Sequence, residues 1–245
     1  MTDSAWLWFY VACMAAGALL FSIWSRRPTG VPQYEYTIAI IIPVWSGLAY
    51  VAMALGQGMI TTADNTVYYA RYIDWVVTTP LLLWALAATA MFYRRLDPAL
   101  IAGLMFADVI MILSGLFADL STDPNDKWLW YIIGCVCLAL IVWNVWWPLR
   151  RIAYDQSREL GTAYTKAATM LTVLWIGYPT FWALGPSGIG VFDRSTDLML
   201  FVLLPIVSKV GFSILDLSQL RKLGARRPGY ASGQDGHGLS DLPRR

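Results

Sequence analysis

The chain has 245 residues, of which 58% are hydrophobic and only 14% are charged. Its 13 tryptophans and its mean hydropathy of +0.52 exclude an ordinary soluble domain of this size. The net charge of +2 is too small to indicate a nucleic-acid partner, and we expect none.

Seven apolar stretches are long enough to cross the hydrocarbon core of a bilayer, which takes about 20 residues in a helix. The first lacks the basic start and cleavage site of a signal peptide, so we interpret it as a retained helix. We therefore expect one all-α seven-helix transmembrane domain over residues 1–222, with 223–245 as a flexible cytoplasmic tail. The predicted spans are Ala5–Trp24, Tyr34–Leu55, Val67–Ala90, Leu100–Leu120, Trp128–Trp147, Ala167–Leu184 and Asp197–Leu217.

Basic residues predict the orientation. Of the 18 lysines and arginines, 14 fall at one end of the predicted bundle, two lie within spans (Arg71 and Lys209), and two fall at the other end (Lys127 and Arg194). The positive-inside rule then places the N-terminus outside and the C-terminus in the cytoplasm. We expect a multi-pass protein of a prokaryotic plasma membrane.

One lysine, Lys209, interrupts the apolar stretch Leu200–Asp216. A charge at the centre of a membrane helix costs roughly 2.5–3.5 kcal/mol on insertion scales, so such a lysine needs a partner or a chemical use. A Schiff base with a carbonyl ligand provides a use, because the amine becomes a covalent attachment point. The alternative is a side chain that snorkels to the interface, which the apolar residues on both sides disfavour.

The third span carries Arg71, Asp74 and Thr78 at helical spacing, on one face. An aspartate that faces the interior of a bundle is a natural counter-ion for a cation on another helix. A merely structural pair between Arg71 and Asp74 is the alternative.

Three further acids can either transfer protons or have only a solvated or structural role. Glu35 begins the second span, Asp108 lies about a third of the way across the fourth, and Asp216 follows Lys209 by two turns. Glu35 and Asp216 can equally be solvated helix-end acids, and Asp108 can be a neutral carboxyl that links helices. Near the other end, we expect only solvated acids, namely Asp119, Asp123 and Asp126.

The sixth span presents Trp175, Tyr178 and Trp182 at spacings of three and four residues. Such a stripe is more often bundle core than a binding site, although a flat conjugated ligand needs aromatic walls. The three cysteines lie within spans without the other ligands of a metal site, so we expect packing roles and no metal, for Cys13, Cys135 and Cys137.

Together these residues resemble the microbial rhodopsins. The segments ARYIDWVVTTPLLL, WIGYPTFW and SKVGF carry the resemblance, which covers the chain from the first span to Asp216. It implies all-trans or 13-cis retinal bound to Lys209 as a protonated Schiff base, Asp74 as counter-ion and Arg71 as an extracellular gate. The implied retinal pocket consists of Trp75, Thr78, Thr79, Met111, Tyr131, Gly134, Trp175, Tyr178, Trp182, Pro205 and Ser208.

The departures from outward proton pumps of that family are informative. Their second aspartate, four residues before the lysine, is Pro205 here, and their cytoplasmic proton donor is Ala85. One of their release glutamates corresponds to Ser187, whereas Asp197 occupies the other position. Outward pumping is therefore disfavoured.

Pro205, the segment GVPQYEY and Asp216 resemble the xenorhodopsin group, which includes Anabaena sensory rhodopsin and light-driven inward proton pumps. We expect an inward pump rather than an enzyme, with Asp216 as the cytoplasmic proton acceptor and Glu35 and Asp108 along the path. The alternative is a photochromic sensor that signals to a soluble cytoplasmic transducer. A channel or receptor for a diffusible ligand is weaker, and family resemblance suggests a homotrimer.

Overall fold

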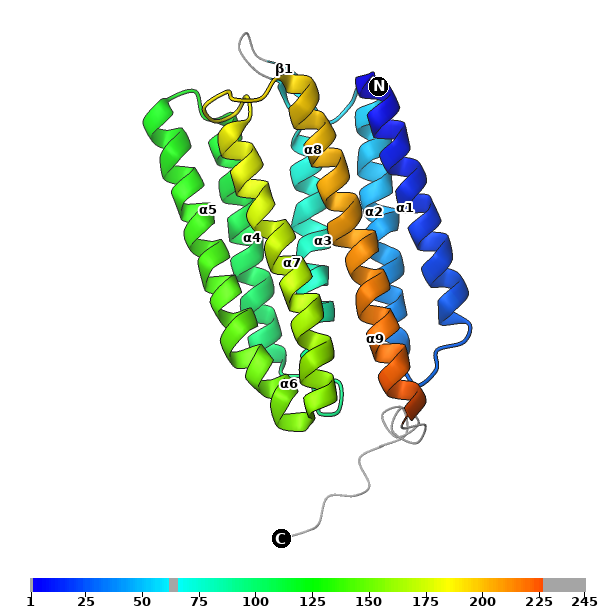
Figure 1. Cartoon of the computed structure of the whole chain (residues 1–245). Helices are drawn as coiled ribbons and strands as arrows, with labels where there is room; N and C mark the ends of the chain where they lie inside the picture. Colours follow the sequence, from blue (N-terminus) through cyan, green and yellow to red (C-terminus); the bar gives the residue numbers. More distant parts are fainter. Residues whose placement is uncertain (1, 62–65, 227–245) are drawn as a thin grey trace.

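The computed structural model describes residues 2–61 and 66–226, which form an all-helical bundle with one short β-hairpin (Figure 1). Seven helices or continuous helical runs are long and apolar enough to cross a membrane, which confirms the predicted fold class. They are α1 (Asp3–Ser25), α2 (Gln33–Ala54), α3 (Tyr69–Ala90), α4 (Pro98–Leu120), α5–α6 (Pro124–Asn144 and Arg150–Gln156), α7 (Arg158–Leu184) and α8–α9 (Arg194–Ile206 and Phe212–Arg226).

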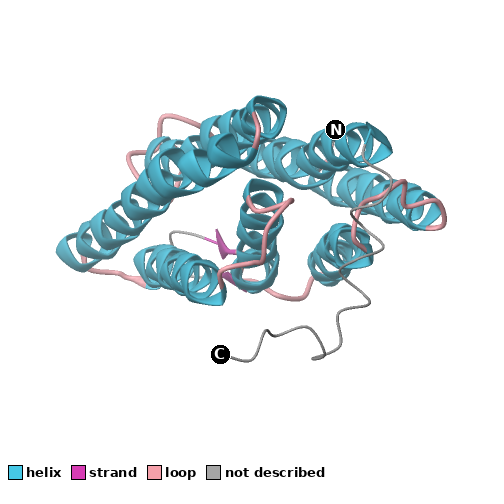
Figure 2. Cartoon of the chain, turned by 90° about the horizontal axis from the view of Figure 1, so that it is seen from below, coloured by secondary structure: helices cyan, strands magenta, loops and turns pink. Residues whose placement is uncertain are grey.

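The helices stand side by side and run along a common direction, as the view down the bundle shows (Figure 2). The N-terminus of α1 lies at one end together with strands β1 (Ile60–Thr61) and β2 (Thr66–Val67), which pair antiparallel. We call this the hairpin end, and the opposite end, where α9 finishes, the tail end. The most buried helix is α3, which packs against α2, α4, α7 and α9 and so carries its polar side chains into the interior.

Several helices begin at capping residues that the sequence supplies. Asp97 and Asp123 each precede a proline at the first helical position, and their carboxylates accept hydrogen bonds from the free backbone N–H groups that follow. Ser157 caps α7 in the same way, through the N–H of Leu160. These caps satisfy donors that a helix start leaves unpaired, and they position α4, α5 and α7.

Two short π-helices interrupt the longest runs. Val145–Leu149, which contains Pro148, joins α5 to α6, and Val207–Gly211 joins α8 to α9 two residues after Pro205. Proline removes a backbone donor and so disturbs the regular hydrogen bonds of a helix. At the first residue of the earlier π-helix, the Tyr164 hydroxyl of α7 donates to the Val145 carbonyl at 2.6 Å. The second π-helix contains Lys209, so the backbone departs from regular α-helical geometry at the lysine itself.

The structure extends three predicted spans at the tail end. The α5–α6 run continues to Gln156, α7 begins at Arg158, and α9 continues to Arg226 beyond the predicted domain boundary at 222. Hydropathy marks only the apolar part of a helix, whereas backbone hydrogen bonds continue through polar residues. The predicted flexible tail lies, from residue 227 onward, outside the described residues.

Candidate functional site

Lys209 lies at the centre of a polar cluster inside the bundle. Its side chain is buried, with 1% of the residue exposed, and Nζ forms a buried ion pair with the Asp74 carboxylate. Nζ also donates to the Ser46 hydroxyl at 2.9 Å. The snorkelling alternative is therefore wrong, because the charge is neutralised within the membrane region and not at its surface.

Hydroxyl groups complete the surroundings of Asp74. Ser46 donates to Oδ2 at 2.9 Å, and the Thr78 hydroxyl shares its proton between Oδ1 at 3.2 Å and the Asp74 backbone carbonyl at 2.8 Å. Because the single proton of Ser46 goes to Asp74, the 2.6 Å contact between Tyr10 and Ser46 has Tyr10 as the donor. The sequence analysis did not assign Tyr10 or Ser46 to the site. The signal for Ser46 was a serine in the middle of an apolar span.

Arg71 does not pair with Asp74. Its guanidinium forms an ion pair with Asp197 of α8 at 3.7 Å, nearer the hairpin end, and lies 4.5 Å from the ring centroid of Phe201. The structural Arg71–Asp74 pair left open by the sequence is therefore wrong. Arg71 and Lys209 form ion pairs with different carboxylates, those of Asp197 and Asp74.

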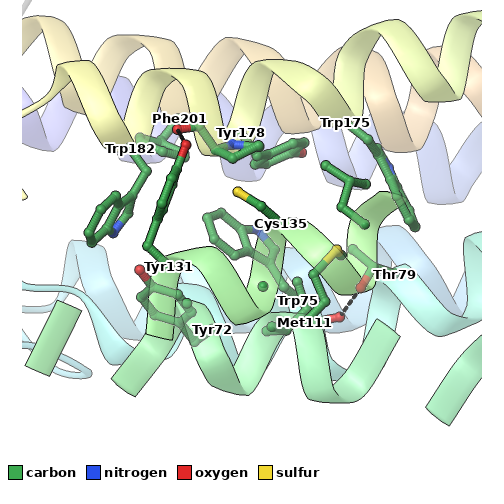
Figure 3. A pocket seen from close by; sticks show the side chains of 15 residues that line it. Tyr72, Trp75, Thr79, Met111, Tyr131, Cys135, Trp175, Tyr178, Trp182 and Phe201 are labelled. Atoms are coloured by element: carbon green, nitrogen blue, oxygen red, sulfur yellow. Dashed lines mark hydrogen bonds between the residues drawn. The ribbon is translucent and has the colours of Figure 1, made fainter. Parts of the chain in front are cut away.

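An apolar cavity of about 100 Å³ lies between α3, α4, α5, α7 and α8 (Figure 3). Tyr131 and Trp182 stack at one end with ring centroids 5.1 Å apart, and Trp175 and Thr79 stand at the other. Its lining includes eight residues that the resemblance assigned to a retinal pocket: Trp75, Thr79, Met111, Tyr131, Gly134, Trp175, Tyr178 and Trp182.

Three assigned pocket residues do not line this cavity. Thr78 bonds to Asp74, Pro205 precedes the π-helix, and the hydroxyls of Ser208 and Tyr178 share a hydrogen bond of 2.8 Å. Lys209 does not line it either, but it follows Ser208 in the chain, so the cavity and the lysine are adjacent. The sequence analysis missed other lining residues, notably Tyr72, Cys135 and Phe201.

On the tail side of Lys209, Asp216 and Glu35 share a second, small cavity of about 10 Å³, roughly what one water molecule needs. Both acids are buried, with 3% and 2% of the residue exposed. Asp216 accepts a hydrogen bond of 2.8 Å from Thr89, whereas Oε1 of Glu35 has no hydrogen-bond partner among the described residues. The interpretation of either acid as a solvated helix end is therefore wrong.

Thr89 was not predicted, although a signal existed. It lies 15 residues after Asp74 and 11 after Thr78, which places all three on one face of α3. Ala85, also on α3, lines the same small cavity as Asp216.

Asp108 of α4 lies elsewhere, beside the aromatic cavity. Its Oδ2 is 2.6 Å from the Thr79 hydroxyl, which also donates to the Trp75 carbonyl at 2.8 Å. The contact joins α3 to α4, and Asp108 is not among the residues that line the cavity of Asp216 and Glu35. The structure thus does not bring the three acids of the expected path together.

Asp119 corrects another expectation. It lies in the last turn of α4 rather than in a loop, its Oδ1 is enclosed, and its Oδ2 accepts a hydrogen bond of 3.2 Å from Tyr72. Asp123 and Asp126 are exposed as expected, with Asp123 capping α5. Helix geometry, which hydropathy does not report, turns Asp119 inward.

The sequence model of the family described as bacteriorhodopsin-like protein matches residues 1–223. The chain belongs to this family of microbial rhodopsins. Archaerhodopsin-1 of Halorubrum ezzemoulense is 30% identical over 228 residues, covering 91% of this chain and 86% of its own length. Sensory rhodopsin-2 of Natronomonas pharaonis is 30% identical over 229 residues, covering 93% of each.

Solved structures agree with this assignment. The thermophilic rhodopsin from Rubrobacter xylanophilus superposes with a TM-score of 0.87 at 32% identity, covering 95% of this chain and all of its own. The light-driven proton pump LR (Mac) from Leptosphaeria maculans superposes with a TM-score of 0.82 at 28% identity, covering 90% of this chain and 95% of its own. The rhodopsin fold and membrane location follow.

Family membership implies a retinal chromophore bound to a lysine. Of the four lysines in the chain, only Lys209 is buried, since Lys127 is half-buried and Lys166 and Lys222 are exposed. The lining of the larger cavity also fits a flat polyene, because its walls are aromatic and Gly134 leaves room. A Cβ on Gly134 would stand 3.4 Å from the Met111 carbonyl oxygen. Among the described residues, Lys209 and this cavity are the lysine and the cavity that fit retinal.

Proposed function

We propose that this rhodopsin is a light-driven inward proton pump of the xenorhodopsin type, in a prokaryotic plasma membrane. When bound, retinal, in all-trans or 13-cis form, supplies the light absorption and an isomerisation that redirects the Lys209 nitrogen. The chain's own residues then decide where the proton on that nitrogen goes. The observation that carries the proposal is the buried pair Asp216 and Glu35 on the tail side of Lys209.

Asp216 is suited to accept a proton. It lies seven residues after Lys209, about 10 Å along the helix axis. Two carboxyls in one small cavity disfavour double ionisation, so the pair with Glu35 keeps at least one proton. The Thr89 hydroxyl donates to Asp216 and so favours the carboxylate there, which leaves Glu35 as the neutral partner. When a proton reaches Asp216, Glu35 can release its own proton toward the tail end and then take the proton from Asp216.

The resting state is held by Asp74. Its ion pair with Lys209 and the two hydroxyl donors Ser46 and Thr78 stabilise a carboxylate beside a protonated nitrogen. We therefore propose Asp74 as the counter-ion and Arg71, paired with Asp197, as the gate toward the hairpin end. Asp108, bonded to Thr79, serves in this proposal as a link between α3 and α4 rather than as a step in the path.

Inward transport also requires the orientation that the basic residues predict, with the hairpin end outside and the tail end in the cytoplasm. Moving a proton inward across a membrane of 100 mV, negative inside, releases about 2.3 kcal/mol. Such transport dissipates stored energy, so its use in the cell is control of pH or potential. A homotrimer in the lipid bilayer is part of the same proposal.

The test is the light-induced pH change of retinal-supplied cells that express the full chain, with and without a protonophore. External alkalinisation that the protonophore abolishes is the expected result. External acidification would overturn the direction of transport.

The Asp216→Asn variant tests the acceptor. We expect it to lower the initial transport rate by about a hundredfold, the usual contribution of a positioned proton-transfer group. The matched control is Asp155→Asn, an exposed acid at the same end whose only ion pair with a described residue is with Arg151 at 3.9 Å. Undiminished transport in Asp216→Asn would remove Asp216 from the mechanism.

A photosensor is the second candidate, favoured by the similarity to sensory rhodopsin-2 and by one contact at the tail end. An exposed ion pair of 3.3 Å joins Glu159 of α7 to Arg226 of α9, so a movement of α7 would change the surface offered to a soluble transducer. Coloured cells without net transport, together with a cytoplasmic protein captured by the tail end only in light, would favour this function.

A further inference from the structure

Asp119 is a half-buried acid at the hairpin end that the mechanism above does not use. Its Oδ1 is enclosed, and its Oδ2 accepts the hydrogen bond of 3.2 Å from Tyr72. Tyr72 reaches inward from there, because its ring lines the retinal cavity and contacts Trp75 with centroids 5.2 Å apart. Asp119 is thus connected to the retinal site through one side chain.

Charged and polar groups from four other parts of the chain act on Asp119. Arg71 and Tyr72 belong to α3, Asp197 to α8, Lys127 to the first turns of α5, and Ser187 to the turn after α7. Arg71 is buried, and its Nε and Nη2 donate to no described residue.

Asp119 differs from the other two acids in this half of the molecule because it has no ion pair. Asp74 pairs with Lys209, and Asp197 pairs with Arg71, whereas no ion pair joins Asp119 to a cation among the described residues. An enclosed carboxylate oxygen without a cation is costly, so Asp119 is most stable with a proton.

We propose that Asp119 is the residue that exchanges the transported proton with the medium at the hairpin end, acting with Tyr72, Arg71 and Asp197. The O–H bond of the Asp119 carboxyl breaks, and the proton passes by way of Asp74 to the Lys209 nitrogen. Arg71, with its free donors, stabilises the carboxylate that remains. Asp119 then recovers a proton from the medium. The direction of this step, though not the exchange itself, rests on the proposed inward transport.

The experiment compares Asp119→Asn with Asp119→Glu in purified, retinal-loaded full-length protein after a single flash. We expect Asp119→Asn to slow reprotonation of the Lys209 nitrogen about tenfold or more, and Asp119→Glu to stay within about threefold of the unmodified protein. In infrared difference spectra, Asp119→Asn should lose one carboxylic carbonyl band, and its resting visible spectrum should stay unchanged. Asp126→Asn, an exposed acid beyond the same helix, is the matched control.

A purely structural role of Asp119 predicts a different result. If Asp119 only anchors Tyr72, Asp119→Asn keeps every carbonyl band and an unchanged reprotonation rate, and the proposal is overturned. Should Asp119→Asn give no coloured protein, Tyr72→Phe replaces it, because that change removes only the hydroxyl donor. A shifted carbonyl band with slower reprotonation in Tyr72→Phe supports the proposal, and an unchanged band and rate overturn it.

The two proposals fail separately. Flash and infrared signals on purified protein report whether Asp119 loses and regains a proton, whatever the direction of transport. Cells without inward transport, but with the Asp119 signal, would refute only the pump. Inward transport with no Asp119 signal would refute only this inference.

Discussion

The buried acids on the two sides of Lys209 differ in what lies beside them. Toward the hairpin end, Asp74 pairs with Lys209 and Asp197 pairs with Arg71. Toward the tail end, Asp216 has a threonine hydroxyl, and Glu35 has no hydrogen-bond partner at Oε1 among the described residues. An acid beside a cation keeps its charge, whereas an acid beside another acid shares or holds a proton. The two acids paired with Lys209 and Arg71 therefore keep their charge, whereas the pair Asp216 and Glu35 can receive a proton.

The largest expected effect is on the lysine itself. Lys209→Ala removes the attachment point for retinal, so purified protein supplied with retinal should show no visible absorption band. Lys222→Ala, at an exposed lysine of the tail end, should keep the full band. A coloured Lys209→Ala protein would mean that another residue binds the chromophore.

Asp74→Asn tests the ion pair between Asp74 and Lys209. It leaves a buried cation without its partner, which costs about 3–5 kcal/mol, so the temperature at which the colour bleaches should fall sharply. The control is Thr78→Val, which keeps the shape of the side chain, removes a neutral donor to Asp74 and should cost about 1 kcal/mol. Equal losses in the two variants would mean that the ion pair contributes no more than a hydrogen bond.

Glu35→Gln tests the pair of acids Glu35 and Asp216. The amide preserves shape but cannot carry a proton, so inward transport should slow about tenfold while thermal stability changes by less than about 1 kcal/mol. Thr89→Val, which removes the donor to Asp216, should slow transport less. If Glu35→Gln instead destabilised the protein as much as Asp74→Asn, Glu35 would contribute to stability like an ion-paired acid, and the contrast with Asp74 would not hold.

The smallest effect is expected at the surface. Glu159→Gln breaks the exposed pair with Arg226 and should change stability by less than about 0.5 kcal/mol, with transport unaltered. Loss of transducer binding in this variant, with intact colour, would favour the sensor over the pump.

Much of this could be predicted from sequence because the membrane imposes a simple rule. Apolar stretches of sufficient length become helices, so the seven spans were recognisable. The lysine in the last span was recognisable as a functional candidate for the same reason, because a charge within a membrane helix is costly unless it has a partner or a chemical use. Helix lengths at the tail end were underestimated, because hydropathy falls where Arg150 and Arg158 begin polar turns that remain helical.

Most partners of the charged groups could not be predicted from spacing, because they depend on which helix faces which. The family resemblance implied Asp74 as the counter-ion at Lys209, and the structure has that ion pair, whereas the pairing of Arg71 with Asp197 was not expected. Asp119 was assigned to solvent by its position near the end of a span, and packing against Tyr72 turns it inward.

By itself, the sequence determined a seven-helix membrane protein with one lysine inside its last span, because composition and hydropathy express local physics. The aromatic pocket around that lysine was implied by the family resemblance. Only the tertiary structure decided that Arg71 pairs with Asp197, that Asp216 and Glu35 share one small cavity, and that Asp108 stands apart from them. Those relations join α2, α3, α4, α8 and α9 across the bundle. Contacts of that kind arise from helix packing, and no spacing within a single helix encodes them.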